Sequence, residues 1–391
     1  MRVMSSIEYW VWLSSLFELS IISKAELLRH YGDPENIFHA PQREIDALCR
    51  ERRADARALS KRDLSVADTI LGDCDRQGLK IVTMQDALYP NRLKYIYAPP
   101  AVLYVKGRLP CLDDEAAIAV AGTRGATPYG IKMGRDLAGE IIRCGGIIVS
   151  GLTRGVDAAA AEGALLAGGV CVGVLGTAHE RQKSELSLDV AARGALVGEY
   201  PPGMPNYYSH FRERNRITAG LSVGVVVVEA PQGSGALLLA TEAAEQGKET
   251  FAVPGNADAP NSAGTIALMQ EGAKPVTCGW DVMCEFAGLY QQKVHKPKPQ
   301  NFLPKPAEEK KDIDKEKDKG YIDLREQLSQ LSEDQLKIIA AIDKQAVHID
   351  DIIEATGLGT AKVLSQLTIL EIKGFVRRET GRRITLNTAK K

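Results

Sequence analysis

The pattern of hydrophobic and polar positions changes along the chain and divides it into regions of different type. Residues 1–75 show short helical patterns, interrupted by polar breaks at Ser23, at residues 32–34 and at Pro41, with no strand-like alternation. We therefore predict a small all-helical domain of the SAM or helix-hairpin-helix type over residues 1–75.

The apolar run at residues 9–22 predicts an amphipathic core helix. Its apolar side is expected to consist of Trp10, Leu13, Phe17 and Ile21. Acidic residues before and within this run, and the lack of a small-residue cleavage site after it, argue against a signal peptide. Because no apolar run in the sequence reaches the roughly 20 residues that a spanning helix needs, we expect no membrane segment.

From residue 76 the pattern becomes one of strands and helices. Two short strands, 79–83 and 102–107, precede five near-continuous apolar runs at residues 117–121, 146–151, 170–176, 224–230 and 250–255. Helical patterns lie between these runs at residues 130–143, 156–167 and 236–246. Strands without polar alternation are buried on both faces, which is typical of a parallel sheet covered by helices. We therefore predict a doubly wound α/β domain over residues 76–290.

The C-terminal part of the sequence predicts a linker and a third domain. Residues 291–320 contain four prolines and a mixed Lys/Glu/Asp run but few large apolar residues, so we expect a flexible, disordered linker. Residues 321–391 then show three helical patterns and two strand patterns, at 331–342, 348–356, 360–373, 375–378 and 383–386. This order is typical of a winged helix-turn-helix domain.

The overall composition and net charge indicate little about function, but the positions of the charged residues indicate more. The chain has 49 Lys and Arg against 50 Asp and Glu, and a net charge of −1 gives no indication of a nucleic-acid partner. The arginines, however, gather in the loops after the strands, at residues 212–216 and near the C-terminus. The seven cysteines are scattered without a CxxC pair, and the six histidines show no ligand spacing. We therefore expect no metal site and no disulfide framework, and we expect a cytoplasmic protein.

The ends of the predicted parallel strands carry the candidate chemistry. Each is followed by glycine and polar residues, and ligands of parallel α/β sheets bind at this edge. Glycine lets backbone N–H groups approach an anion, the following helix N-terminus adds partial positive charge, and two arginines add full charges. The residues expected to form this phosphate-binding pocket are Gly122, Thr123, Arg124, Gly151, Arg154, Gly155, Asp157, Gly176, Thr177, Ser234, Gly235 and Gly255.

A basic segment lies between the third and fourth of these strands. It contains an aromatic residue, three arginines and an amide, which suit a groove that binds single-stranded nucleic acid. Its candidate residues are Phe211, Arg212, Arg214, Asn215 and Arg216. If the segment is helical, its alternating arginines cannot all share one face.

Enzyme motifs are missing from the sequence. It has no GxGxxG fingerprint, no Walker A sequence, no nucleophile elbow and no carboxylate cluster. We therefore expect a non-enzymatic binding protein that needs no cofactor.

The motifs occur in an order that resembles the DprA/Smf family of DNA-processing proteins. In this sequence they read AGTRGATPYG, SGLTRGVDAAA, GEYPPG, HFRERNRITAGLS, VVVVEA, SGALLLA and FAVPG, within residues 80–285. The resemblance implies an extended Rossmann-like domain that binds single-stranded DNA and forms a homodimer. It also implies a role in natural transformation and homologous recombination, in which the protein protects incoming strands and loads RecA recombinase. Most of the pocket and basic-segment residues given above match the family's motifs. Five of them are predicted from the strand-end and basic-segment patterns alone, namely Thr123, Gly176, Thr177, Phe211 and Arg212.

The sequence departs from the family's pattern at several positions. The departures are Ala161, Ala178, Leu239 and Ile266, and we expect them to cluster around the edge of the pocket and to affect its specificity.

Two other functions remain open at this point. The fourth loop resembles that of nucleotide phosphoribohydrolases, but Leu239 stands at the position of their catalytic glutamate and only Glu242 could replace it. Alternatively, the winged helix could be a duplex-DNA-binding regulator with residues 360–373 as its recognition helix. Its basic wing would consist of Lys373, Arg377, Arg378, Arg382 and Arg383.

Overall fold

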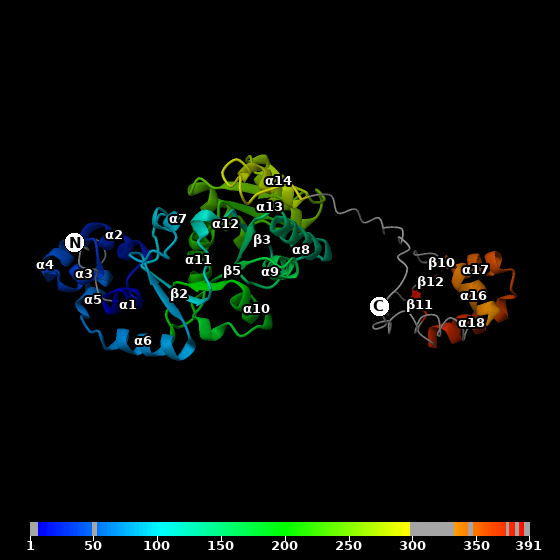
Figure 1. Cartoon of the computed structure of the whole chain (residues 1–391), viewed down its shortest axis with the longest axis horizontal. Helices are drawn as coiled ribbons and strands as arrows, with labels where there is room; N and C mark the ends of the chain where they lie inside the picture. The colour runs from blue at the N-terminus through cyan, green and yellow to red at the C-terminus, as the bar shows by residue number, and fades with distance from the viewer. Residues whose placement is uncertain are drawn as a thin grey trace, which may run out of the picture. The chain divides into compact units, whose positions relative to one another are not determined.

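The computed structural model describes residues 7–48, 53–297, 332–342, 347–372, 375–379 and 383–386. The chain divides into two compact units, residues 1–301 and 302–391, which are described separately (Figure 1). Within the described residues, none of the helices combines the length and the apolar character needed to cross a bilayer.

The N-terminal region is helical, as the sequence predicts. Its helices are α1 (Ile7–Ser15), α2 (Ile21–Tyr31), α3 (Pro34–His39), α4 (Gln42–Leu48), α5 (Arg53–Ser60) and α6 (Ser65–Gln77). Their core also contains Val102 and Tyr104 of the sheet, and the Tyr104 hydroxyl lies 2.7 Å from Ser14 Oγ. The helical region therefore shares a hydrophobic core with one edge of the α/β domain.

The single helix predicted over residues 9–22 is wrong. Helix α1 ends at Ser15, and α2 begins after Ser20, whose side chain accepts a hydrogen bond from the Ser23 N–H. This N-cap stabilises a new helix start and changes the direction of the chain. As a result Phe17 is 46% exposed, whereas Leu16 and Leu19 are buried in its place.

The α/β domain is built on one nine-stranded sheet in the order β1-β2-β6-β5-β4-β3-β7-β8-β9. Strand β2 pairs antiparallel with β1 and with β6, and the strands from β6 to β9 are parallel. The strands are β1 (Lys80–Thr83), β2 (Val102–Gly107), β3 (Ala117–Ala121), β4 (Ile147–Ser150), β5 (Cys171–Leu175), β6 (Ala195–Gly198), β7 (Gly224–Val227), β8 (Glu249–Ala252) and β9 (Lys274–Pro275). The predicted doubly wound fold is confirmed, although β6 and β9 were not predicted.

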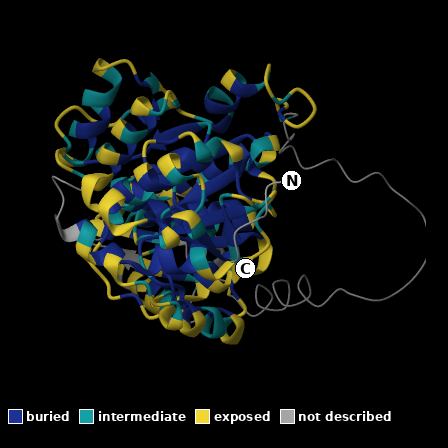
Figure 2. Ribbon diagram, turned by 90° about the vertical axis from the view of Figure 1, so that its left-hand side faces the viewer, coloured by how far each residue is buried: buried dark blue, intermediate teal, exposed yellow. Residues whose placement is uncertain are grey.

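Helices cover both faces of this sheet (Figure 2). They are α7 (Asn91–Lys94), α8 (Pro128–Arg143), α9 (Val156–Leu166), α10 (Glu185–Arg193), α11 (Tyr208–Leu221), α12 (Gly235–Glu245), α13 (Ala263–Gln270) and α14 (Gly279–Met283). Short 3₁₀ turns occur at η1 (Leu112–Asp114), η2 (His179–Arg181), η3 (Pro260–Ser262) and η4 (Cys284–Phe286).

Strand β3 shows why the apolar runs predict a covered sheet. Ala117 and Ala119 belong to the core on one face, and Ile118 and Val120 belong to the core on the other. All four are fully buried, and burial of a Val or Ile side chain contributes about 1.5–3 kcal/mol.

The α/β unit extends beyond residue 290. Val294 is buried, the His295 N–H donates to the Cys144 carbonyl over 3.1 Å, and Lys293 pairs with Glu115 at 2.7 Å. The first residues assigned to the linker by sequence therefore pack on the folded unit. The rest of the predicted linker lies outside the described residues.

The C-terminal unit contains the predicted winged helix. Its elements are α16 (Glu333–Ala340), β10 (Val347–His348), α17 (Ile349–Thr356), α18 (Thr360–Ile372), β11 (Val376–Glu379) and β12 (Arg383–Leu386). The strands pair in the order β10-β12-β11. Ser332 caps α16 together with Gln335, and Gly357 ends α17 with a φ of 64°, where glycine is strongly favoured.

Candidate functional site

The site predicted from sequence lies where the order of the parallel strands reverses. Strand β3 pairs with β4 on one side and with β7 on the other, so the loops that follow β3 and β7 meet at the carboxyl edge of the sheet. Such a switch point is the usual ligand position in open α/β sheets. Thr123, after β3, donates its N–H to the Glu229 carbonyl, after β7, over 2.7 Å.

Glu229 holds the loop between β3 and α8. Its buried carboxylate accepts hydrogen bonds from the Thr127 N–H at 2.9 Å and the Thr127 hydroxyl at 2.5 Å. A Cβ on Gly130 would collide with this carboxylate, so a larger residue there would push the Glu229 side chain away from Thr127. Sequence reasoning missed this role, because Glu229 looks like an ordinary end of a strand until its contact with Thr127 is seen.

Glycines bring the loops after β3 and β4 into backbone contact. Gly155 has a φ of 88° and a ψ of −132°, and a Cβ there would collide with the Thr123 carbonyl oxygen and lie 2.9 Å from Arg124 Cα. A Cβ on Gly122 would lie 2.6 Å from Val156 Cγ2. The two loops therefore lie against each other, as predicted. This contact depends on glycine, which has no side chain, at both positions.

Two of the predicted site residues, Asp157 and Arg214, are buried beneath the loops, and their opposite charges attract each other. Asp157 accepts hydrogen bonds from the Gly122 N–H at 3.3 Å and the Thr153 hydroxyl at 3.0 Å. Arg214 donates to the Val174 carbonyl over 3.1 Å, and a Cβ on Gly151 would collide with its guanidinium. Burial raises the pKa of Asp157 and lowers the pKa of Arg214, and the attraction between the two charges opposes both shifts.

Three other arginines are exposed to solvent, namely Arg124, Arg154 and Arg212. The Arg124 guanidinium lies over the Phe211 ring at 5.3 Å from its centroid, within the range of a cation–π contact. Phe211 also lies against Gly176, where a Cβ would be 3.0 Å from the ring. Helix α11 and the loops after β3 and β5 therefore meet around one aromatic ring. Thr177 follows Gly176 and is half-buried.

The later loops are tied to the first one. Ser234 caps α12, accepting a hydrogen bond from the Ala236 N–H at 3.3 Å, and Gly235 is exposed. Gly255 is exposed, and a Cβ there would collide with Ser262. The Asn261 amide donates to the Gly125 carbonyl at 3.1 Å, and the Tyr129 hydroxyl donates to the Pro254 carbonyl at 2.9 Å. Sequence reasoning did not identify Asn261 or Tyr129.

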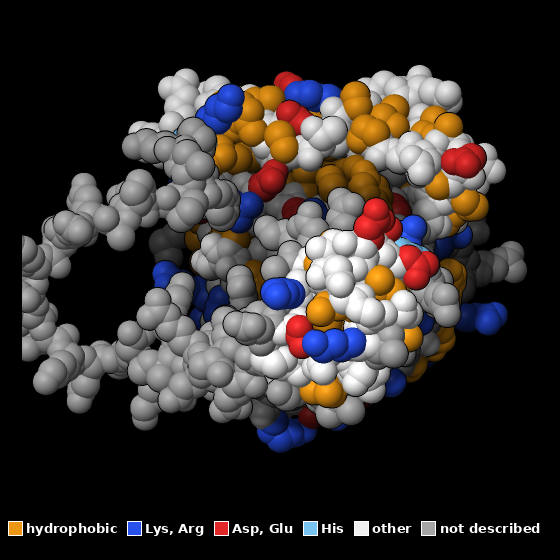
Figure 3. All heavy atoms as spheres, turned by 90° about the vertical axis from the view of Figure 1, so that its right-hand side faces the viewer, with side chains coloured by type: hydrophobic (Ala, Val, Ile, Leu, Met, Phe, Trp, Pro, Cys, Tyr) orange, Lys and Arg blue, Asp and Glu red, His pale blue; other side chains and the backbone are white. Residues whose placement is uncertain are grey.

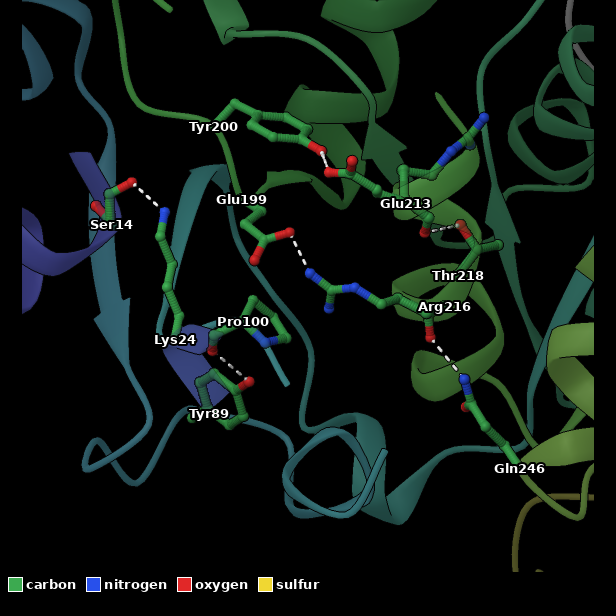
Figure 4. Close-up of polar contacts among 11 residues, drawn as sticks. Ser14, Lys24, Tyr89, Pro100, Glu199, Tyr200, Glu213, Arg216, Thr218 and Gln246 are labelled. Atoms are coloured by element: carbon green, nitrogen blue, oxygen red, sulfur yellow. Dashed lines mark hydrogen bonds and ion pairs between the residues drawn. The ribbon is translucent and has the colours of Figure 1, made fainter. Parts of the chain in front are cut away.

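Arg216 and Asn215 lie inside the protein. The Arg216 guanidinium forms an ion pair with Glu199, and their side chains are 6% and 13% exposed (Figure 4). The Asn215 amide donates to the Gly235 carbonyl at 3.2 Å. Because α11 is helical, Arg212 faces solvent while Arg214 and Arg216 are buried, so the three arginines do not form one surface.

A lysine of the helical region approaches this ion pair. Lys24 donates to the Ser14 carbonyl at 3.0 Å, and Glu199 lies between Lys24 and Arg216 in the view of Figure 4. Burial lowers the pKa of Lys24 to about 8, Glu199 opposes this shift, and Arg216 adds to it. Tyr200 stacks on His210 with ring centroids 3.9 Å apart, and its hydroxyl donates to Glu213 at 2.9 Å.

Exposed aromatic residues extend the surface at the start of α11. Tyr207 is 53% exposed and Tyr208 is 78% exposed, within one turn of Phe211. Sequence reasoning noted only Phe211, although the sequence carries all three rings. In the view of Figure 3, Lys and Arg side chains lie interspersed with Asp and Glu side chains among the described residues.

Most of the positions that depart from the family's pattern lie inside the protein. Ala161, Ala178 and Leu239 are buried in packed hydrophobic clusters, and only Ile266 is partly exposed. Glu242 lies in the last part of α12, where burial and then Glu245 raise its pKa and Arg216 opposes this shift. No group of three or more His, Cys, Asp or Glu residues that could hold a metal is found among the described residues.

The basic wing is described only in part. Arg377 on β11 and Arg383 on β12 are exposed, and Arg378 lies on β11. Lys373 and Arg382 lie outside the described residues.

Comparisons with known proteins agree with the motif order. Residues 80–287 match the family described as DNA recombination-mediator protein A, and residues 324–382 match the DprA winged helix domain. The DNA processing protein DprA of Bacillus subtilis is 38% identical over 55% of this chain and 74% of its own length. Protein Smf of Escherichia coli is 30% identical over 98% of this chain and 96% of its own length.

A solved structure shows the same relationship in three dimensions. The X-ray structure of DNA processing protein A from Streptococcus pneumoniae covers 72% of this chain and 99% of its own, with 31% identity and a TM-score of 0.61. The chain therefore belongs to the DprA/Smf family.

Proposed function

We propose that this protein binds single-stranded DNA at the strand-end loops and acts in DNA uptake and recombination. The observation that carries the proposal is the Arg124–Phe211 contact at the switch point of the sheet. Any nucleobase can stack on an aromatic ring, so this contact does not depend on the DNA sequence. A nearby guanidinium can bind the backbone phosphate. The relatives named as DNA processing proteins support a DNA ligand.

The loops provide further groups for phosphate. Helices α8 and α9 begin directly after the loops that carry Arg124 and Arg154, and their N-termini carry partial positive charge. Arg154 and Arg212 are exposed and form no ion pair with a described residue. We assign phosphate contacts to Arg124, Arg154 and Arg212, and a base contact to Phe211. Arg214, Arg216, Asn215 and Asp157 are assigned a positioning role, because they are buried.

We extend the proposal to the roles that the family resemblance implies. The protein would act in the cytoplasm as a homodimer without catalysis, protect incoming strands and load RecA onto them. A filament assay with RecA, on single strands already coated by a single-strand-binding protein, tests the loading step. Faster RecA filament growth in the presence of this protein is expected, and an unchanged rate would contradict loading.

Strand binding is tested by fluorescence anisotropy of a labelled oligo-dT with the full chain over a series of salt concentrations. Arg124→Ala is expected to weaken binding and to reduce the slope of log K against log salt by about 0.7, the value of one phosphate contact on a single strand. Arg43→Ala is the matched control, because Arg43 is exposed in the helical region. Equal losses in both variants would contradict the site assignment.

A duplex contact by the winged helix is a second candidate. The exposed Arg377 and Arg383 on paired strands favour it. Loss of duplex binding in Arg377→Ala/Arg383→Ala, with oligo-dT binding retained, would assign this separate activity to the wing.

A further inference from the structure

A cavity of about 460 Å³ lies between the helical region and the segment that joins β1 to β2. Its wall includes Trp10 of α1, Arg29 of α2 and, from the joining segment, Met84, Lys94, Tyr95 and Ile96. This volume is in the range of small-ligand pockets, roughly 300–1,000 Å³. None of the strand-end loop residues lines it, so it is a second and separate place for a ligand.

The cavity combines an apolar wall with positive charge. Among the described residues that line it, Arg29 and Lys94 are the charged ones and none is acidic. Arg29 is exposed and Lys94 is half-buried, and neither forms an ion pair with a described residue. Two cations without a bound carboxylate, beside apolar side chains, suit a ligand that carries both an anionic group and an apolar group.

The aromatic residues that line the cavity indicate which kind of apolar group the ligand would carry. Tyr95 is 86% exposed, so a face of its ring is open to a planar partner. Trp10 is 2% exposed, and its indole Nε1 has no hydrogen-bond partner among the described residues. The neighbouring Trp12, in contrast, donates to the Lys61 carbonyl at 3.1 Å. Trp10 therefore belongs to the closed apolar wall of the cavity, and the exposed Tyr95 ring is the surface on which a planar base can stack.

We propose that this cavity binds a nucleotide unit, with the base against Met84, Ile96 and Tyr95 and the phosphate on Arg29 and Lys94. The unit can belong to a DNA strand or to a free nucleoside monophosphate, which share this chemistry. If the nucleotide unit belongs to a DNA strand, the inference rests on the function proposed above. If the unit is a free nucleotide, the inference does not rest on that function. A strand held at both places would be bound by the helical region as well as by the sheet.

The experiment measures two ligands with the full chain. Binding of dTMP is followed by calorimetry, and binding of a long oligo-dT is followed by anisotropy over a series of salt concentrations. We expect saturable dTMP binding that is lost in Arg29→Gln/Lys94→Gln. For the oligonucleotide, removal of two phosphate contacts is expected to lower the salt slope by about 1.4.

Matched variants separate the cavity from general effects of charge and surface. Arg43→Gln/Arg57→Gln removes two exposed positive charges from the same helical region outside the cavity. Tyr97→Ala is the control for Tyr95→Ala, because Tyr97 is 73% exposed two residues away and does not line the cavity. Tyr95→Ala is expected to weaken binding by about fivefold or more through the lost stacking contact, and Tyr97→Ala is expected to have no effect.

The outcomes distinguish the two proposals. Loss of both dTMP and oligonucleotide affinity in the cavity variants supports a strand contact, and loss of dTMP binding alone supports a free nucleotide. If the wild type binds dTMP but no oligonucleotide, the strand-binding function fails while the cavity site stands. Absence of saturable dTMP binding, or equal binding in the cavity and control variants, would overturn the inference.

Discussion

The glycine contact between the first two strand-end loops gives the sharpest structural prediction. Gly155→Ala places a methyl group against the Thr123 carbonyl oxygen and 2.9 Å from Arg124 Cα, both of which are backbone atoms. The alanine would also have to keep a φ of 88° and a ψ of −132°. The loop that carries Arg124 must therefore move away, or the start of α9 must unwind.

The magnitude follows from two costs. A non-glycine residue in such a conformation costs on the order of 1–3 kcal/mol. Overpacking against groups that cannot rotate aside typically adds about 1–3 kcal/mol. Gly155→Ala is therefore expected to lower the free energy of unfolding by roughly 2–6 kcal/mol.

Gly168→Ala is the matched control. Gly168 has a φ of 76°, but nothing lies within 4 Å of a Cβ built there. Its substitution should cost only the conformational preference, about 1–2 kcal/mol. Urea unfolding followed by circular dichroism measures both variants, and oligo-dT anisotropy tests whether the Arg124 loop still binds. If Gly155→Ala were no less stable than Gly168→Ala and bound DNA like the wild type, the proposed packing of the two loops would be refuted.

Three further predictions concern the buried polar groups. Arg216→Met should destabilise the fold by about 3–5 kcal/mol because it leaves the Glu199 carboxylate, 13% exposed, without its ion-pair partner, and adding Glu199→Gln should restore most of the loss in thermal melts. Burial lowers the pKa of His179 to about 4, so the wild type should lose stability as the pH falls from 6.5 through 4. His179→Gln should lose less stability over this range. Parallel curves of stability against pH for the two proteins would contradict this. Because the pKa of Lys24 falls from 10.5 to about 8 on folding, wild-type stability should gain a contribution as the pH rises from 8 to 10.5, and Lys24→Met should lack that rise.

The parts of the fold that could be predicted depend on local patterns. The apolar run of β3 and the glycine-rich turns after the parallel strands are short-range features, and the structure has them where the sequence predicts them. Strand β6 was missed because only three apolar residues lie between Gly194 and Gly198, too few to show a pattern. The break between α1 and α2 was missed because the apolar run continues through the Ser20 cap.

The side-chain roles were harder to predict than the loops. Arg124 and Arg212 are exposed as a binding role requires, but Arg214 and Arg216 are buried beside Asp157 and Glu199, which come from distant parts of the chain. Sequence periodicity shows that these arginines cannot share one face of a helix. The periodicity does not show which of these arginines lies next to a carboxylate inside the protein, because that depends on long-range packing.

Photo-cross-linking tests the central claim most directly. An oligo-dT that contains 5-iododeoxyuridine is bound to the full chain, irradiated and mapped by mass spectrometry of the peptides. We predict cross-links at Phe211 and the neighbouring Tyr208 in the wild type, with a strong reduction in Arg124→Ala. Efficient cross-linking confined to residues 332–391, with none at the start of α11, would contradict strand binding at the strand-end loops.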